Sequence, residues 1–178
     1  MKKGDVKLFN EIFHIRRYLK SLVYGGLDGI ITTFAVVAGV AGASLSSGII
    51  LILGLANLLA DGFSMAVGDY LSTRALREYE GDSTKSKIPL KNAFYTFFSF
   101  LIFGLIPLLA FIVSYFTFIN NPLLFSVVLT LISLFLLGVI KSKVTGKHPI
   151  ISGLETLLIG GLAAGVAYIV GYLLSGLA

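Results

Sequence analysis

Three aspartates stand inside apolar stretches of this sequence that are long enough to cross a membrane. Asp28 lies in one such stretch, and Asp61 and Asp69 lie in the next. A carboxylate in hydrocarbon costs several kcal/mol unless it is paired, hydrated or protonated. These acids are therefore the first candidates for chemistry in the chain.

The second apolar stretch carries three polar residues and a methionine at a regular interval of four. Asn57, Asp61, Met65 and Asp69 would form a slowly drifting stripe along one side of a helix. Carboxylate oxygens alone suit hard cations, and a thioether shifts the preference toward softer transition metals. Asp28, Asp61 and Met65 together predict a site for a borderline divalent ion such as Fe²⁺, although Mn²⁺, Co²⁺ and Zn²⁺ also fit. The alternative for Met65 is a side chain that fills a gap in the core.

The composition is that of an integral membrane protein. Of 178 residues, 56% are hydrophobic and 13% are charged, and the mean hydropathy is +0.93. A soluble domain has about 25% charged residues. We predict an all-α, multi-pass fold with residues 1–21 as an amphipathic cytoplasmic interfacial helix and residues 22–178 as a transmembrane domain. Its five predicted spans are Leu22–Leu45, Ile49–Thr73, Ala93–Phe116, Leu123–Ile140 and Ile151–Leu174.

The basic residues lie on one side of this predicted topology. All 14 Lys and Arg fall before residue 21, between residues 74 and 91, or between residues 141 and 147. The positive-inside rule then predicts a cytoplasmic N-terminus and an external C-terminus. The net charge of +5 is thereby explained, and no basic patch is left for nucleic acid.

Depth places some of the polar residues together. Counted from the predicted inner ends of the helices, Asp28 lies about 9 Å deep, between Asp69 at about 6 Å and Met65 at about 12 Å, with Asp61 at about 18 Å. We therefore expect Asp28 to lie level with the turn from Met65 to Asp69.

The first span presents a face of polar and small residues that permits close approach and leaves room for water or an ion. The members of this face are Asp28, Thr32, Ala35, Gly39 and Gly42. A metal needs about four to six ligands, which is more than one chain offers. We therefore predict a homodimer through the first and second helices, embedded in the lipid bilayer.

Asp28 and Asp61 are also predicted to couple metal to protons. Scarce water disfavours a charged carboxylate, so each should hold a proton more readily than an exposed aspartate. A divalent ion needs the deprotonated form, so binding would displace protons. The predicted counter-ion is therefore H⁺, and the transported metal is a substrate rather than a permanently bound cofactor.

Three further residues are candidate ligands with structural alternatives: Asn57, Asp69 and Glu155. The acids of the second span could instead hydrogen-bond between helices or pair with Arg74 or Arg77, and Glu155 could pair with Lys147 or Lys143.

The chain lacks the sequence signatures of the common enzyme classes. It has no cysteine, no histidine pair within a span, no GxSxG and no phosphate-binding loop, so we predict that it is not an enzyme. Two alternatives to a proton-coupled metal transporter stay open. One is a passive divalent-cation channel, and the other is a non-transporting scaffold whose acids join helices.

Two segments carry a resemblance to a known family. GGLDGIITTFAVVAGVAGA and GLANLLADGFSMAVGDYLS resemble the paired first and second helices of the vacuolar iron transporter family, and GLETLLIGGLAAGVAYIVG resembles its fifth. That family includes fungal and plant vacuolar iron and manganese transporters and the nodulin-like proteins. The resemblance implies a five-helix protomer, a homodimer, and export of Fe²⁺ or Mn²⁺ from the cytosol in exchange for protons, with Asp28 and Met65 lining the ion path.

The chain also departs from that family in two places. The connection from Arg74 to Asn92 is too short for the Glu-rich cytoplasmic metal-binding domain that many members carry. Asn57 stands where some members have a glutamate, which removes a charge from the implied path.

Overall fold

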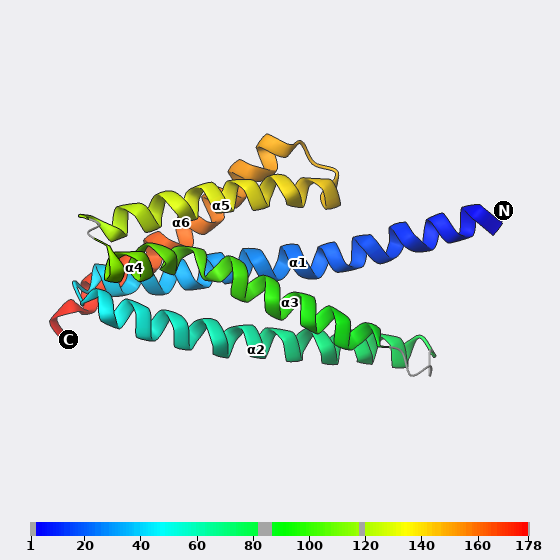
Figure 1. Ribbon diagram of the computed structural model, residues 1–178, viewed down its shortest axis with the longest axis horizontal. Coiled ribbons are helices and arrows are strands. Elements are labelled where there is room, and N and C mark those ends of the chain that lie inside the picture. The colour runs from blue at the N-terminus through cyan, green and yellow to red at the C-terminus, as the bar shows by residue number, and fades with distance from the viewer. Residues whose placement is uncertain (1–2, 82–86, 118–119, 178) are drawn as a thin grey trace.

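The computed structural model describes residues 3–81, 87–117 and 120–177, with side chains from residue 19 onwards except residue 144. Within these residues the fold is all-helical without strands, as predicted (Figure 1). The helices are α1 (Lys3–Gly42), α2 (Ser47–Tyr79), α3 (Ile88–Gly104), α4 (Ile106–Phe116), α5 (Pro122–Thr145) and α6 (Pro149–Leu174), followed by the short 3₁₀ helix η1 (Ser175–Leu177).

The predicted spans are confirmed with small shifts in their ends. Four helical segments are long and apolar enough to cross a membrane, and the bent pair α3–α4 makes a fifth. The four are Leu19–Gly42, Ser47–Tyr79, Pro122–Lys143 and Pro149–Leu177. The protein is therefore an integral, multi-pass membrane protein.

The third span differs from the single straight helix that the sequence predicts. It is broken between Gly104 and Ile106, and its two halves meet at an angle of 47°. Pro107 has no backbone N–H and its ring clashes with the carbonyl one turn earlier, which ends α3 at this point. The hydroxyl of Ser126 in α5 donates to the Pro107 carbonyl at 2.6 Å, so a neighbouring helix holds the bend in place.

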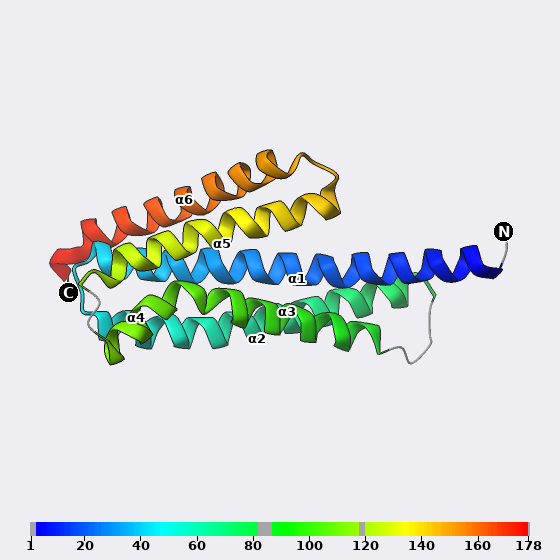
Figure 2. The ribbon, with the colours of Figure 1, turned by 45° about the horizontal axis from the view of Figure 1, so that its top comes forward.

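Helix α1 lies in the middle of the molecule, with α2 and α3 on one side and α5 and α6 on the other (Figures 1 and 2). Its closest approaches are made through glycines. A Cβ on Gly29 would collide with the Phe100 carbonyl of α3, and a Cβ on Gly42 would collide with the Tyr168 carbonyl of α6. Only a residue without a side chain permits such contact.

This packing corrects one expectation about the first span. Its small-residue face was expected to stay open for water, an ion or a second subunit. At the outer end, α6 instead occupies that face, because a Cβ on Gly171 would strike the Gly39 carbonyl and Gly42 abuts Tyr168. The part of the face near Asp28, Thr32 and Ala35 is only partly buried.

The N-terminal segment continues directly into the first span. The backbone is helical from Lys3 to Gly42 without interruption. Side chains before residue 19 lie outside the described part, so the interfacial position of residues 1–21 and the domain boundary at residue 22 remain predictions.

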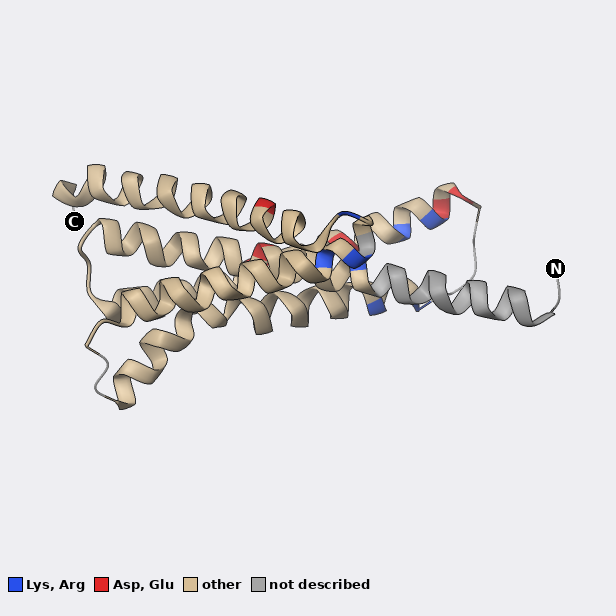
Figure 3. Cartoon of the chain, turned by 90° about the horizontal axis from the view of Figure 1, so that it is seen from above, with Lys and Arg blue, Asp and Glu red and all other residues tan. Residues whose placement is uncertain are grey.

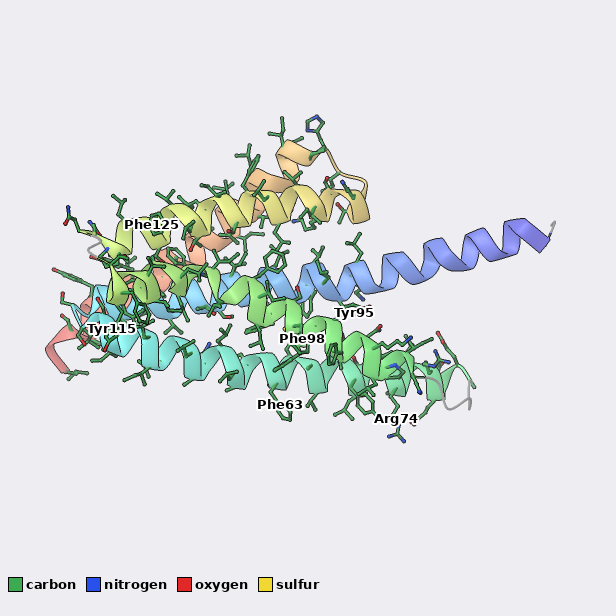
Figure 4. All side chains as sticks on the ribbon, in the orientation of Figure 1. Phe63, Arg74, Tyr95, Phe98, Tyr115 and Phe125 are labelled. Carbon is green, nitrogen blue, oxygen red and sulfur yellow. The ribbon has the colours of Figure 1, made fainter. Side chains whose placement is uncertain are left out.

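The surface of the bundle divides into a charged end and an apolar body. In Figure 3 the coloured lysine and arginine positions lie toward the end where α1 begins, whereas the end near the C-terminus is free of them among the residues drawn in colour. On the body, large apolar side chains such as Phe63, which is 66% exposed, project outward from the helices (Figure 4). Such a surface fits a lipid environment.

Candidate ion site

The tight turn that joins α1 to α2 sets the register between these two helices. Residues 43–46 join the two helices, with Ser44 in the left-handed conformation at φ 58°. Asp28 precedes the end of α1 at Gly42 by 14 residues, and Asp61 follows the start of α2 at Ser47 by 14 residues. At 1.5 Å per residue both therefore lie about 21 Å from the turn.

The expected level of Asp28, the turn from Met65 to Asp69, is thus corrected by one to two helical turns. Asp28 is level with Asp61, whereas Asp69 is level with Ser21, to which it is hydrogen-bonded. The expectation was wrong because it was counted from the inner ends, and both helices extend past those ends. Depths on the two helices must be counted from a common origin, and the turn that joins α1 to α2 provides it.

Asp28 lies within a membrane span, and its carboxylate has no bonding partner among the described residues. Its side chain is partly buried, and in the described part of the chain its carboxylate makes no hydrogen bond or ion pair. The Thr32 hydroxyl donates to the backbone carbonyl of Asp28 at 2.8 Å, not to the carboxylate. Asp61 is close enough to interact with it electrostatically.

Asp61 and Asn57 form a pair along α2. The Asn57 amide donates to Asp61 Oδ2 at 2.8 Å, as their spacing of four residues allows. One oxygen of the Asp61 carboxylate is therefore held, and its other oxygen has no bonding partner among the described residues. Met65, one turn further, is partly buried and packs against the main apolar cluster.

Asp69 has a different environment, since three hydroxyl groups donate to its carboxylate. Ser21 of α1 donates to Oδ2 at 3.1 Å, and Thr96 of α3 donates to the same oxygen. Thr73 of α2 donates to Oδ1 at 3.2 Å, and Asn92 of α3 donates in turn to Thr73 at 3.5 Å. Hydrogen bonding between helices, one of the alternatives named for this acid, is therefore what the structure shows.

An ion pair between Asp69 and Arg74, another alternative named for this acid, is not found among the described residues. The Arg74 guanidinium pairs with Glu78 at 2.8 Å, and both side chains are more than half exposed. In Figure 4 Arg74 points away from the bundle.

Glu155 lies among lysines, as its structural alternative predicted. It contacts Lys147 at 3.1 Å and Lys141 at 3.6 Å. The second partner is Lys141, which reaches across from α5, in place of the expected Lys143.

These residues do not converge on a single cluster within one chain. Among the described residues, no group of three or more His, Cys, Asp or Glu side chains could hold a metal ion. The structure brings Asp28 and Asp61 together, with Asn57 and Met65 within one turn of Asp61. It separates them from Asp69, which lies two turns further along α2 from the α1–α2 turn, and from Glu155 on α6.

Two carboxylates at one depth within a membrane-spanning bundle have a definite chemistry. When both are charged they repel one another, and water is too scarce to screen them. A proton or a divalent cation would relieve that repulsion. The arrangement is therefore suited to exchanging one for the other.

The sequence reasoning missed the hydroxyl partners of Asp69. Ser21 and Thr96 are polar residues that fall on the buried sides of their helices, at 7% and 0% exposure. A polar residue on an apolar helix face signals a partner, yet only the tertiary structure identifies the partner.

Comparison with known proteins identifies relatives along most of the chain. The sequence model of the VIT family matches residues 19–87 and 80–172. A vacuolar iron transporter of Toxoplasma gondii is 30% identical over 224 residues, covering 88% of this chain and 74% of that protein. Vacuolar iron transporter homolog 4 of Arabidopsis thaliana is 30% identical over 161 residues, covering 83% and 79%. Vacuolar iron transporter 1 of Oryza sativa subsp. japonica is 26% identical over 210 residues, covering 84% and 82%.

The lengths of these alignments agree with a short connection after α2. For the Toxoplasma protein, 88% of 178 residues is about 157, so about 67 of the 224 aligned positions have no counterpart in this chain. For the Arabidopsis homolog, 83% is about 148 of 161 positions, so the difference is small. The two matched segments of the family overlap at residues 80–87, between α2 and α3. With those segments together covering the spans from α1 to α6, the chain belongs to the VIT family.

Proposed function

We propose that this protein exports a divalent transition metal, Fe²⁺ or Mn²⁺, from the cytosol in exchange for protons. The observation that carries the proposal is Asp28, an acid within a membrane span that interacts electrostatically with Asp61 and has no bonding partner in the described chain. An intramembrane acid with no structural role marks a pathway for ions. The relatives named vacuolar iron transporters support metal transport, with iron as the substrate.

The ligand chemistry supports a borderline metal. Asp28 and Asp61 offer carboxylate oxygens, and the Met65 thioether adds a softer atom one turn away. Asn57 already donates its amide N–H to Asp61, which leaves the amide oxygen as a neutral ligand.

Proton exchange follows from the same two carboxylates. Facing a neutral cytosol, the site loses protons and binds metal; facing an acidic compartment, it gains protons and releases metal. Driving force therefore comes from a proton gradient without ATP. The distribution of Lys and Arg supports a cytoplasmic N-terminus.

A second copy of the chain would complete the ligand set. Along α2, a stripe of small residues at intervals of four is exposed: Ala56, Ala60, Ser64 and Gly68. A Cβ on Gly68 would meet nothing within 4 Å, so another helix backbone could approach closely there. The neighbouring face of α1, near Asp28 and Thr32, is only partly covered. A two-fold axis here would bring both sets of acids together.

Cysteine crosslinking tests this dimer, since the native chain has no cysteine. Single cysteines at Ala60 or Ser64 should give crosslinked dimers, whereas a cysteine at Leu162 on the equally exposed surface of α6 should not. Crosslinks only from α6 would contradict a dimer through α1 and α2.

The decisive experiment is metal uptake into proteoliposomes with and without a pH gradient. An exporter should accumulate metal only with the gradient and should dissipate that gradient as metal moves. Metal flux without proton counterflow would instead identify a channel. No flux, together with thermal stability that metal does not change, would identify a scaffold.

A further inference from the structure

Helix α3 separates α1 from α2 at the level of Asp28 and Asp61. Phe100 of α3 is fully buried, and its backbone carbonyl lies against Gly29, the neighbour of Asp28. Its ring lies on the other side against Gly62, the neighbour of Asp61, where a Cβ would be 3.2 Å from Phe100 Cδ1. The gap between the two carboxylates therefore depends on how tightly α1 and α2 are held against α3.

The Asp69 carboxylate holds all three helices at the next level inward. Its Oδ2 atom accepts from Ser21 of α1 and from Thr96 of α3, and Thr96 lies one turn before Phe100. Its Oδ1 atom is held by Thr73 within α2 and, through Thr73, by Asn92 of α3. One side chain thus ties the inner parts of α1, α2 and α3 together.

In the described chain, α1 is joined to Asp69 by a single hydroxyl group. Ser21 is 7% exposed and is the residue of α1 that bonds to Asp69 in the described chain. It lies seven residues, or two turns, before Asp28 on a helix that continues without a break. A change in how Ser21 is held is therefore transmitted along a rigid element to Asp28.

We infer that Asp69 is a positioning residue for the ion site, which sets the separation of Asp28 and Asp61 by clamping α1 and α2 onto α3 through Ser21 and Thr96. In this role Asp69 keeps its hydroxyl partners throughout and does not ligate the metal. The inference rests on the proposed function, because it assigns a supporting role to a site that binds metal. Groups that orient the ligands of a metal site typically change affinity or activity by about 10–100-fold when they are removed.

The test uses Mn²⁺ uptake into proteoliposomes by the full chain, and it measures the half-saturating metal concentration and the maximal rate separately. Ser21→Ala should raise the half-saturating concentration about 10-fold. Its unfolding temperature without metal should stay near that of the wild type, because Thr96 and Thr73 still hold Asp69. Thr96→Val should weaken affinity similarly, and Thr96→Ser, which retains the hydroxyl, should restore it.

Ser72→Ala is the matched control. The Ser72 hydroxyl donates at 3.2 Å to the backbone carbonyl of the same Asp69, but Ser72 is exposed and, among the described residues, its side chain bonds to no other helix. It should leave affinity, rate and stability unchanged.

The outcomes separate this inference from the proposed function. If the wild type moves metal and Ser21→Ala and Thr96→Val both match its half-saturating concentration, the positioning role is overturned and the proposed function stands. If the variants lose activity only in proportion to lost folded protein, Asp69 is structural and the inference is again overturned. If the wild type neither binds nor moves metal, the proposed function falls, and this inference falls with it.

Discussion

Asp28 and Asp69 are the same residue type on neighbouring antiparallel helices, two turns apart in depth, and their surroundings are opposite. Asp69 accepts hydrogen bonds from three hydroxyl groups on three helices, which offset the cost of burying its charge. Asp28 has no such donor in the described chain and interacts electrostatically with another acid, Asp61. The contrast shows that the position of an acid in a membrane span does not define its role. The role depends on whether the fold supplies donors for the acid.

The largest effect should come from removing the unpartnered charge. Asp28→Asn should reduce metal transport by more than about 100-fold, beyond the usual effect of losing a supporting group. Its unfolding temperature should equal or exceed that of the wild type, because a neutral amide is cheaper to bury than a carboxylate without partners. Proteoliposome flux and thermal unfolding in detergent measure the two properties. Flux at the wild-type rate would show that the Asp28 carboxylate does not bind the transported metal.

The pH dependence tests whether Asp28 and Asp61 couple metal to protons. Because metal binds the deprotonated form, affinity should fall as pH falls, by about tenfold per pH unit for each proton displaced while the site is protonated. Calorimetry in buffers of different ionisation enthalpy should reveal proton release on binding. An affinity that stays flat at mildly acidic pH, with no release, would leave a channel as the better interpretation.

Substitutions at Met65 can distinguish a side chain that only packs from one that also binds metal. Met65→Leu keeps nearly the same volume against the apolar cluster, so it should cost less than about 1.5 kcal/mol of stability. If the thioether binds metal, the same variant should weaken affinity about 10-fold. Metal titration of Met65→Leu beside Met65→Ala measures this, and equal affinity of Met65→Leu and wild type would reduce Met65 to a packing residue.

The smallest effect is expected at Glu155. This acid is partly exposed and paired with Lys147 and Lys141, and exposed ion pairs contribute little because water and salt screen them. Glu155→Gln should therefore leave transport at the wild-type level and lower stability only slightly. A transport loss comparable to that of Asp28→Asn would bring α6 into the ion site.

The sequence alone determined the membrane class, the number of spans and the candidate acids. Runs of apolar residues have the length of a bilayer whatever they pack against, and so the spans could be predicted from composition and periodicity. The pairing of Glu155 with Lys147 was also predictable, because the two residues stand eight apart around one short turn.

Only the tertiary structure decided how those helices are aligned and which acids are satisfied. The register that pairs Asp28 with Asp61 depends on the turn at residues 43–46, and the clamp on Asp69 depends on α3 standing between α1 and α2. The occupation of Gly39 and Gly42 by α6 depends on contacts between residues more than 120 positions apart. Helical periodicity specifies which face of a helix a residue occupies, but the neighbour that covers that face is fixed by close packing of the whole bundle.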